Sequence, residues 1–142
     1  MTQTQNLSHP HPHPEPLRLA PGSAPVACVD IGGTKVAVSV ADEHGLRGQV
    51  AEPTAKQGAN SALAEQIIRM VHASCRSLDL EASRIAAVGV SSCGPFVLRD
   101  GFVELAAPNI CGGLAGKARG LPNDWTTATL EAPLRAADRT MK

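Results

Sequence analysis

The chain has 142 residues, a length typical of one domain with a hydrophobic core of its own. Its 13 basic and 13 acidic residues cancel, and one Trp, two Phe and no Tyr leave few aromatic side chains for stacking on bases. These features exclude a strongly basic nucleic-acid-binding protein, and we expect small molecules as partners and no nucleic acid.

Neither the cysteines nor the hydropathy points to an export signal, a membrane or a metal cluster. The four cysteines lie far apart, with no Cys-x-x-Cys pair and no zinc-ligand spacing. No segment approaches the about 18 consecutive apolar residues of a membrane span, and the N-terminus has no basic start followed by an apolar core. We therefore expect a reduced, cytoplasmic protein with no membrane contact.

The first 25 residues form a segment rich in Pro and His, and too few of them are apolar to offset the entropy lost on ordering. We predict a disordered tail over residues 1–25, partly in the polyproline II conformation. His9, His11 and His13 stand at alternate positions and could hold a metal ion. The intervening prolines spread these side chains apart, which favours the plain tail.

Three strands are predicted next. Residues 26–30 and 35–40 are runs of small and β-branched apolar residues, and a third short strand covers residues 47–52 after a turn at His44-Gly45. Three consecutive strands joined by short turns predict an antiparallel meander.

A helix and a fourth strand follow. Over residues 61–78 the apolar residues recur three and four positions apart, with Asn60 or Ser61 as N-cap and Glu65 four residues before Arg69. Residues 84–92 are apolar without polar alternation, which is typical of a strand in a sheet covered on both faces. A helical crossover predicts that this strand pairs in parallel with the first.

The C-terminal part of the chain has weaker signals. Asp100-Gly101 separates two short apolar runs and favours a type I′ hairpin. The Gly-, Ala- and basic-rich segment 111–123 predicts an irregular surface loop. A helix is predicted over residues 131–137, with Pro133 tolerated in its first turn.

The turn between the first two strands, Asp30-Ile31-Gly32-Gly33-Thr34-Lys35, has two interpretations. It is either a plain hairpin turn with an acid beside it, or a turn that binds phosphate. Glycines let an oxyanion approach backbone N–H groups, Thr34 adds a hydroxyl donor, and Lys35 adds positive charge. Asp30 would repel a phosphate, so its role in such a site would be to orient Mg²⁺ or its water shell.

Two segments resemble the ROK family of repressors and sugar kinases, within the actin-like ATPase superfamily. "VDIGGTKVAVSVADEHG" is similar to the first phosphate motif of that family, and "AVGVSSCGPFVLRDGFVELAAPNI" to its Gly-Pro turn, hairpin and Ala-Pro-Asn segment. The resemblance implies an α/β fold, the ribonuclease H-like N-terminal lobe of an actin-like ATPase. Its mixed sheet has three antiparallel strands followed by a helix and a parallel strand. We expect this lobe to occupy residues 26–142 in truncated form, with the second lobe absent.

The resemblance also implies an ATP-dependent, glucokinase-like sugar kinase that phosphorylates a hexose or an N-acetylhexosamine, with ATP and Mg²⁺ as cofactors. By their positions in the motif, the residues implied to bind ATP phosphates and magnesium are Asp30, Gly32, Gly33, Thr34 and Lys35. Asp30 acts on magnesium indirectly. The residues implied to line the sugar site are Gly94, Pro95 and Asn109. The Asn109 amide suits sugar hydroxyls because it both donates and accepts hydrogen bonds. For Asn109, Gly94 and Pro95 a purely structural role as turn residues remains open.

No catalytic residue is assigned, because the general base of the family is an Asp in an Asn-Asp pair that ends a later strand, expected beyond residue 142. Asn123-Asp124 follows Gly120, Leu121 and Pro122 in a predicted loop, so we interpret it as a turn or a helix cap. "GGLAGKARG" lacks the first glycine and the hydroxyl residue of a Walker loop, so Lys117 and Arg119 are assigned to a solvated loop. We expect the isolated chain to be inactive.

Two alternatives remain. A sugar-responsive transcriptional regulator of the same family would need a helix-turn-helix before residue 26, and the tail is too short and too rich in proline for one. The other alternative is a non-catalytic fragment that binds sugar weakly or completes its fold with another chain. An incomplete sheet would leave an unpaired edge, so a homo-oligomer or self-association through that edge is also expected.

Overall fold

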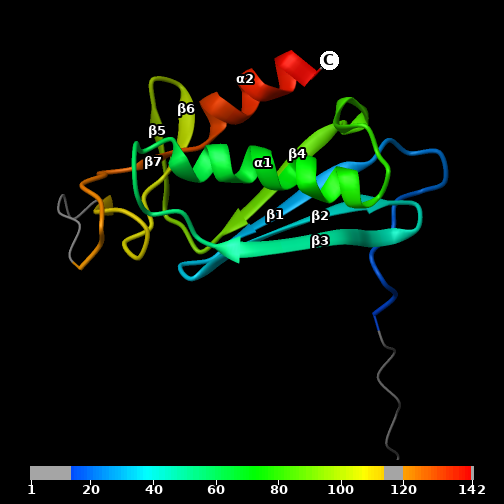
Figure 1. Cartoon of the computed structure of the whole chain (residues 1–142), viewed down its shortest axis with the longest axis horizontal. Helices are drawn as coiled ribbons and strands as arrows, with labels where there is room; N and C mark the ends of the chain where they lie inside the picture. Colours follow the sequence, from blue (N-terminus) through cyan, green and yellow to red (C-terminus); the bar gives the residue numbers. More distant parts are fainter. Residues whose placement is uncertain (1–13, 114–119, 142) are drawn as a thin grey trace, which may run out of the picture.

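The computed structural model describes residues 14–113 and 120–141. Two sheets and two α-helices make up the described structure (Figure 1). The elements in chain order are β1 (Val26–Ile31), β2 (Lys35–Asp42), β3 (Gly45–Pro53), α1 (Ala62–Ser77), the 3-10 helix η1 (Ala82–Arg84), β4 (Ala87–Ser92), β5 (Phe96–Arg99), β6 (Phe102–Leu105), β7 (Ala128–Thr129) and α2 (Glu131–Met141).

The main sheet has the strand order β3-β2-β1-β4. β1, β2 and β3 pair antiparallel, and β4 pairs in parallel with β1 after the α1 crossover. The predicted meander, crossover and parallel pairing are thus confirmed, as is the fold class. The predicted β2 ends two residues early, and the predicted β3 starts two residues late and ends one residue early. The turn between β2 and β3 lies at Glu43-His44, one residue before its predicted position.

α1 supplies much of the core from one face. Its fully buried apolar side chains recur at helical spacing and pack against the buried side chains of β1 and β2. Ser61 occupies the N-cap position, but its hydroxyl bonds the Glu65 carboxylate at 3.0 Å rather than a backbone N–H. The expected Glu65–Arg69 pairing is not found, because Arg69 reaches across to Glu52 on β3 at 2.9 Å.

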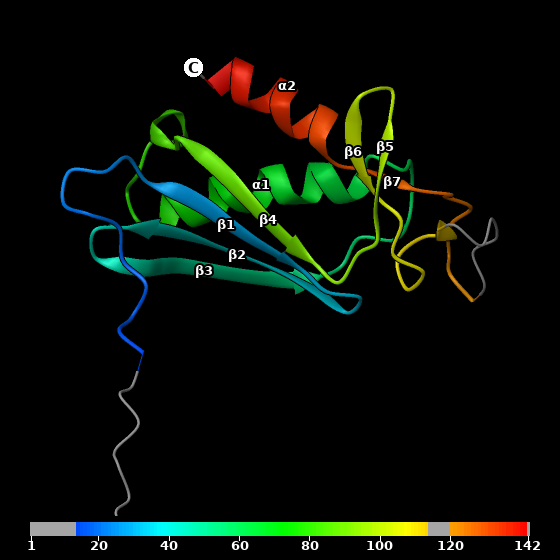
Figure 2. The ribbon, with the colours of Figure 1, turned by 180° about the vertical axis from the view of Figure 1, so that it is seen from behind.

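The prediction that β4 is buried on both faces is wrong. Ala87, Gly89 and Ser91 are exposed and Val88 and Val90 are half-buried, because β4 is an edge strand. α1 and α2 lie on the same face of the sheet (Figures 1 and 2), and no helix in the described part of the chain covers the other face. The lack of polar alternation in this strand therefore comes from its small residues, and not from helices that cover both faces of the sheet.

The structure contains a second sheet of β5, β6 and β7, of which the sequence predicted the β5–β6 hairpin but not β7. The Asp100-Gly101 hairpin is confirmed, with positive φ at both residues, 51° and 83°. β7 has two residues, too few for a periodic signal. Cys111, Gly112 and Gly113 are buried rather than in a surface loop, and the N–H groups of Gly112 and Gly113 donate to the carbonyls of Trp125 and Thr126. Residues 114–119 lie outside the described structure.

The helix predicted at residue 131 is confirmed and continues to Met141 as α2. Its first residue holds the helix to the second sheet. The Glu131 carboxylate accepts a hydrogen bond from the Val103 N–H at 2.7 Å and one from the Arg135 guanidinium at 2.7 Å. These donors hold the pKa of Glu131 below its usual value, the Val103 N–H contributing most.

Residues 14–25 form no helix or strand. The Leu19 N–H donates to the Asp42 carbonyl at 2.9 Å, and the Gly22 N–H donates to Glu43 Oε2 at 3.1 Å, so the end of this segment lies on the β2–β3 turn. His9, His11 and His13 lie outside the described residues. No helix in the described ranges is long and apolar enough to cross a membrane.

Candidate functional site

The predicted phosphate turn leaves the sheet beside the Gly94-Pro95 turn. Ile31 pairs with Ser92 at the ends of the parallel strands β1 and β4, so the segments that follow both strands emerge at one edge of the sheet. In sheets with parallel strands this edge is where ligands are commonly bound. The fold therefore brings the two sequence motifs to one place.

The backbone of this turn is fixed from behind by the segment after β3. The Thr54 hydroxyl donates to the Gly32 carbonyl at 2.7 Å, and the Thr54 N–H donates to the Thr34 carbonyl at 3.0 Å. Thr54 is 8% exposed, so both bonds are shielded from water. Nothing in the sequence pointed to Thr54, because its partner atoms are backbone oxygens 20 or more residues away.

The N–H groups of the turn are used unequally. The Gly32 N–H donates to the Lys35 carbonyl at 2.9 Å and closes the turn. Within the described residues, the N–H groups of Gly33 and Thr34 have no hydrogen-bond partner, and both residues are accessible. Two accessible, unpartnered N–H groups next to each other can bind an anion.

Asn109 lies directly against Gly33. A Cβ atom built on Gly33 would lie 2.0 Å from Asn109 Nδ2, so the glycine is needed to admit the amide. Asn109 is exposed, but Ile110 and Cys111 after it are buried, and their N–H groups donate to the Ala107 carbonyl at 3.0 and 2.9 Å. The structure therefore places the predicted sugar-side residue next to the predicted phosphate turn.

Pro95 is connected to the same segment. The Ala106 N–H donates to the Pro95 carbonyl at 2.8 Å, which ties the Gly94-Pro95 turn to the chain leading to Asn109. Gly94 has φ 61°, a conformation that favours glycine. Both residues therefore have a structural reason to be where they are, and a contact with sugar remains a prediction.

Asp30 and Lys35 flank the turn and are both exposed. Asp30 pairs with Ala37 and Ser91, and because its neighbours Val29 and Ile31 face the helices, it lies on the face without helices. None of three cavities, beside β4, at the C-terminal end of α1 and beside Trp125, is lined by the turn. The site is an open surface with one wall.

The structure contains no ready-made metal cage in its described part, where no group of three or more His, Cys, Asp or Glu side chains is arranged to hold a metal ion. Asp30 offers one carboxylate beside the turn. A single carboxylate suits Mg²⁺ that keeps most of its waters and takes further oxygens from phosphates.

The Asn123 side chain of the Asn123-Asp124 pair has a structural role, which agrees with the interpretation of the pair as part of a loop. The Asn123 amide donates to the carbonyls of Lys56 and Ile110 at 2.8 and 2.9 Å and accepts from the Trp125 N–H at 3.1 Å. All three bonds are to backbone atoms, so the side chain is fully engaged in joining two loops. Lys117 and Arg119 lie outside the described residues.

The cavity beside Trp125, of about 420 Å³, was not predicted. Its one deeply buried charge is Glu104, which accepts from the Thr127 hydroxyl and pairs with Arg99 Nε at 3.2 Å. These contacts join β5, β6 and the segment before β7. The buried charge of this cavity is therefore part of a satisfied structural pair.

Comparison with known proteins supports the fold assignment. No protein-family model matches the chain, and no curated protein matches its sequence. Among solved structures, the chain is similar to a ROK hexokinase from Thermus thermophilus, with a TM-score of 0.53 and 26% identity over 82% of this chain. The match covers 32% of the hexokinase, so the chain spans about a third of the length of that enzyme.

Two weaker matches have a TM-score of 0.48. One is a ROK family glucokinase from Streptomyces griseus, solved with glucose and AMPPNP, at 24% identity over 82% of this chain and 30% of that one. The other is an inorganic polyphosphate/ATP-glucomannokinase from Arthrobacter sp. strain KM, at 21% identity over 84% and 41%. The Thermus match confirms the resemblance to the ROK family that the two motifs predicted.

Proposed function

We propose that this chain provides the phosphate-binding turn and one wall of the sugar site of a ROK-type, ATP-dependent sugar kinase. Its structural resemblance to a ROK hexokinase supports the reaction class. Because the chain covers about a third of that enzyme, we propose for it the functions that its own residues can perform. These are binding of ATP phosphates and positioning of a hexose or N-acetylhexosamine.

The observation that carries this proposal is the contact between Gly33 and Asn109. In a kinase, the terminal phosphate of the nucleotide has to meet a sugar hydroxyl, so a phosphate site and a sugar site must touch. Here a turn with two free N–H groups lies against an amide that can both donate to and accept from hydroxyls. A sugar hydroxyl bound by Asn109 would therefore lie beside a phosphate bound by the turn.

The residues around the turn fit a nucleotide phosphate with magnesium. Gly33 and Thr34 would donate backbone N–H groups to phosphate oxygens, with the Thr34 hydroxyl and Lys35 ammonium as further donors. Asp30 would hold a water of the hydrated ion. Bound magnesium would neutralise phosphate charge as it develops. A general base is not assigned to any described residue, so we propose binding rather than turnover for this chain by itself.

Titration calorimetry with ATP, with and without magnesium, tests this proposal. Asp30→Asn is expected to weaken binding of MgATP about tenfold, the loss of roughly one charge-assisted hydrogen bond, and to leave magnesium-free ATP unaffected or bound more tightly. Asp100→Asn removes another exposed acid, from the hairpin turn, and keeps a residue that tolerates its positive φ. It is expected to bind MgATP as the unchanged chain does.

The proposal fails if the chain binds no MgATP at millimolar ligand. It also fails if Asp30→Asn and Asp100→Asn change MgATP affinity equally, because the acid beside the turn would then have no particular role.

A further inference from the structure

We infer that Gln66 of α1 is a positioning residue for the candidate site. Its side chain holds the segment after β3, residues 53–56, and that one segment holds both the phosphate turn and the chain next to Asn109. The identity of the two ligands, MgATP and a sugar, rests on the proposed function. The hydrogen bonds that make up the network do not.

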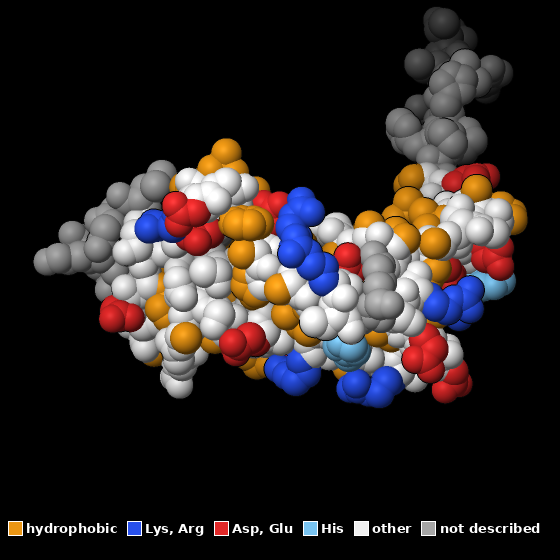
Figure 3. All heavy atoms as spheres, turned by 90° about the horizontal axis from the view of Figure 1, so that it is seen from above, with side chains coloured by type: hydrophobic (Ala, Val, Ile, Leu, Met, Phe, Trp, Pro, Cys, Tyr) orange, Lys and Arg blue, Asp and Glu red, His pale blue; other side chains and the backbone are white. Residues whose placement is uncertain are grey.

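Gln66 is a buried polar residue on the apolar face of α1. It is 6% exposed, and Leu63 and Met70, one turn before and one turn after it, are fully buried. Charged side chains of both signs are spread over the surface in Figure 3, whereas Gln66 lies beneath the surface. A buried amide costs free energy unless its donor and its acceptor are both bonded. Its hydrogen-bond partners therefore explain why a polar residue stands here.

Both ends of the Gln66 amide bond the backbone on either side of Thr54. Gln66 Nε2 donates to the Pro53 carbonyl at 2.7 Å, and Gln66 Oε1 accepts from the Ala55 N–H at 2.9 Å. Thr54 itself donates, through its N–H and its hydroxyl, to two carbonyls of the phosphate turn. Gln66 thus fixes the backbone of the residue that supports the turn.

The same segment also holds the chain next to Asn109. The Lys56 carbonyl accepts a hydrogen bond from Asn123 Nδ2 at 2.8 Å, and the same nitrogen donates to the Ile110 carbonyl at 2.9 Å. Ile110 directly follows Asn109. Residues 53–56 therefore reach the phosphate turn through Thr54 and the sugar side through Asn123. Transfer between two bound groups depends on their relative position, which this segment and Gln66 would set.

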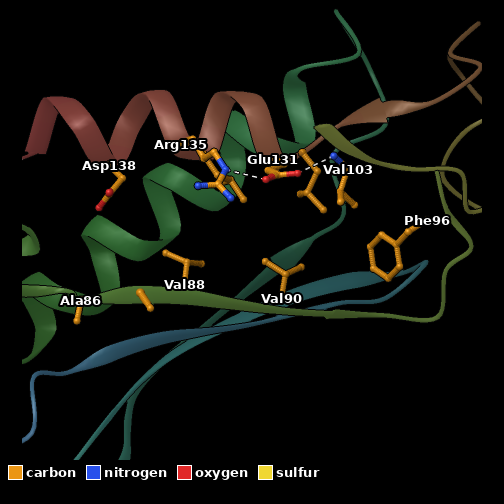
Figure 4. Close-up of a pocket in the computed structure, with 11 residues that line it drawn as sticks. Ala86, Val88, Val90, Phe96, Val103, Glu131, Arg135 and Asp138 are labelled. Atoms are coloured by element: carbon orange, nitrogen blue, oxygen red, sulfur yellow. Dashed lines mark hydrogen bonds and ion pairs between the residues drawn. The ribbon is translucent and has the colours of Figure 1, made fainter. Parts of the chain in front are cut away.

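A different side chain joins α2 to the rest of the structure. In the cavity beside β4, Figure 4 shows Glu131 between the Val103 N–H and Arg135, and it bonds both at 2.7 Å. That contact holds β6. The bonds of Gln66, Thr54 and Asn123 described above all lie within residues 32–123, so the network needs no contact from α2.

Hydrogen exchange of the unliganded full chain is the first measurement. Gln66→Met keeps a side chain of similar length and leaves the Pro53 carbonyl and the Ala55 N–H without their partner. The bonded N–H groups of Gly32 and Ile110 report on the two halves of the site. Their protection, relative to the most protected core amides, is expected to fall about tenfold, the loss of roughly one hydrogen bond.

Ser74→Ala is the matched control on the same helix. Ser74 lies about two turns after Gln66, is fully buried, and donates its hydroxyl to the Gly48 carbonyl on β3 at 2.6 Å. The change removes a comparable buried bond away from the site. It is expected to lower the free energy of unfolding in urea and to leave the relative protection of Gly32 and Ile110 unchanged.

Titration calorimetry with MgATP and with glucose separates the two branches. Thr54→Val removes the hydroxyl and is expected to weaken MgATP binding about tenfold and glucose binding less, whereas Thr54→Ser keeps the hydroxyl and the affinity. Asn123→Asp keeps the acceptor for the Trp125 N–H and loses the donor, so it is expected to weaken glucose more than MgATP. Gln66→Met is expected to weaken both about tenfold.

Three results would overturn the inference. The first is unchanged protection of Gly32 or of Ile110 in Gln66→Met. The second is an equal loss of protection in Ser74→Ala, and the third is a Thr54→Val variant and an Asn123→Asp variant that weaken the two ligands in the same ratio. If Gln66→Met does not fold, Gln66→Glu, which loses only the donor, is judged by the same criteria.

Failure of the proposed function has a different signature. A chain that binds neither MgATP nor glucose contradicts that function, while hydrogen exchange of the unliganded chain still decides whether Gln66 positions the two halves of the site.

Discussion

Gly33→Ala is expected to weaken the binding of both MgATP and glucose about tenfold, and to leave the free energy of unfolding nearly unchanged. The added Cβ would lie 2.0 Å from Asn109 Nδ2 and 2.8 Å from Asn109 Cγ, so the amide has to move. Asn109 is exposed and can move without disturbing the core. Gly33 has no positive φ, so alanine causes no backbone strain. Titration calorimetry measures both affinities.

A double-mutant cycle separates this effect from a general disturbance of the turn. Asn109→Ala is expected to weaken glucose binding as much as Gly33→Ala does, and the double variant no more than either, because both changes remove the same amide. Gly89→Ala is the matched control, since its Cβ has only an ordinary contact. Fully additive losses of glucose affinity would show that Asn109 and Gly33 act independently.

Trp125→Ala is expected to lower the free energy of unfolding by about 3–5 kcal/mol, the usual cost of removing a large buried side chain. Trp125 is 5% exposed, belongs to the hydrophobic core, and donates its indole N–H to the Gly58 carbonyl at 2.9 Å. Its own carbonyl accepts from the Gly112 N–H. The side chain therefore joins the loop after β3 to the segment before β7.

Urea denaturation followed by circular dichroism measures this loss, because Trp125 is the only tryptophan and its fluorescence disappears with it. Trp125→Phe keeps a large aromatic ring but removes the N–H donor and part of the ring volume, so a smaller loss of about 1–3 kcal/mol is expected. A Trp125→Ala loss no larger than that of Trp125→Phe would contradict the buried position of the ring.

Local patterns predicted the elements that depend on local sequence. The helical spacing of Leu63, Ile67 and Val71 gave α1, and Asp100-Gly101 gave the β5–β6 hairpin. Both signals come from neighbours within a few residues, which share a face of a helix or close a turn. The order of strand, helix and strand then fixed the parallel β1–β4 pair, because such crossovers have one usual solution.

Where a feature depends on residues far apart in the sequence, the prediction was wrong or was not made. The burial of β4 depends on where the helices lie, and α2 shares a face with α1. Arg69 had a local partner in Glu65 but pairs with Glu52, which only the tertiary fold brings near. The support of the phosphate turn by Thr54 likewise could not be read from a motif.

The sequence predicted the candidate site as two separate motifs. It could not predict that the two motifs are in contact. Nothing in the sequence says that Asn109 touches Gly33, because the intervening 75 residues include a helix, a crossover strand and a hairpin. The two glycines were explained by access for phosphate. The structure adds a second reason for Gly33, which is space for the Asn109 amide.

The most direct test of the phosphate site is a titration of the ¹⁵N-labelled chain with MgATP, followed by the amide signals in NMR spectra. We predict that the amides of Gly33 and Thr34 shift most, because they are accessible and unpartnered, and that Gly32, already bonded to Lys35, shifts less. Shifts confined to the cavity beside β4 or the one beside Trp125, with Gly33 and Thr34 unmoved, would contradict a phosphate-binding role for the turn.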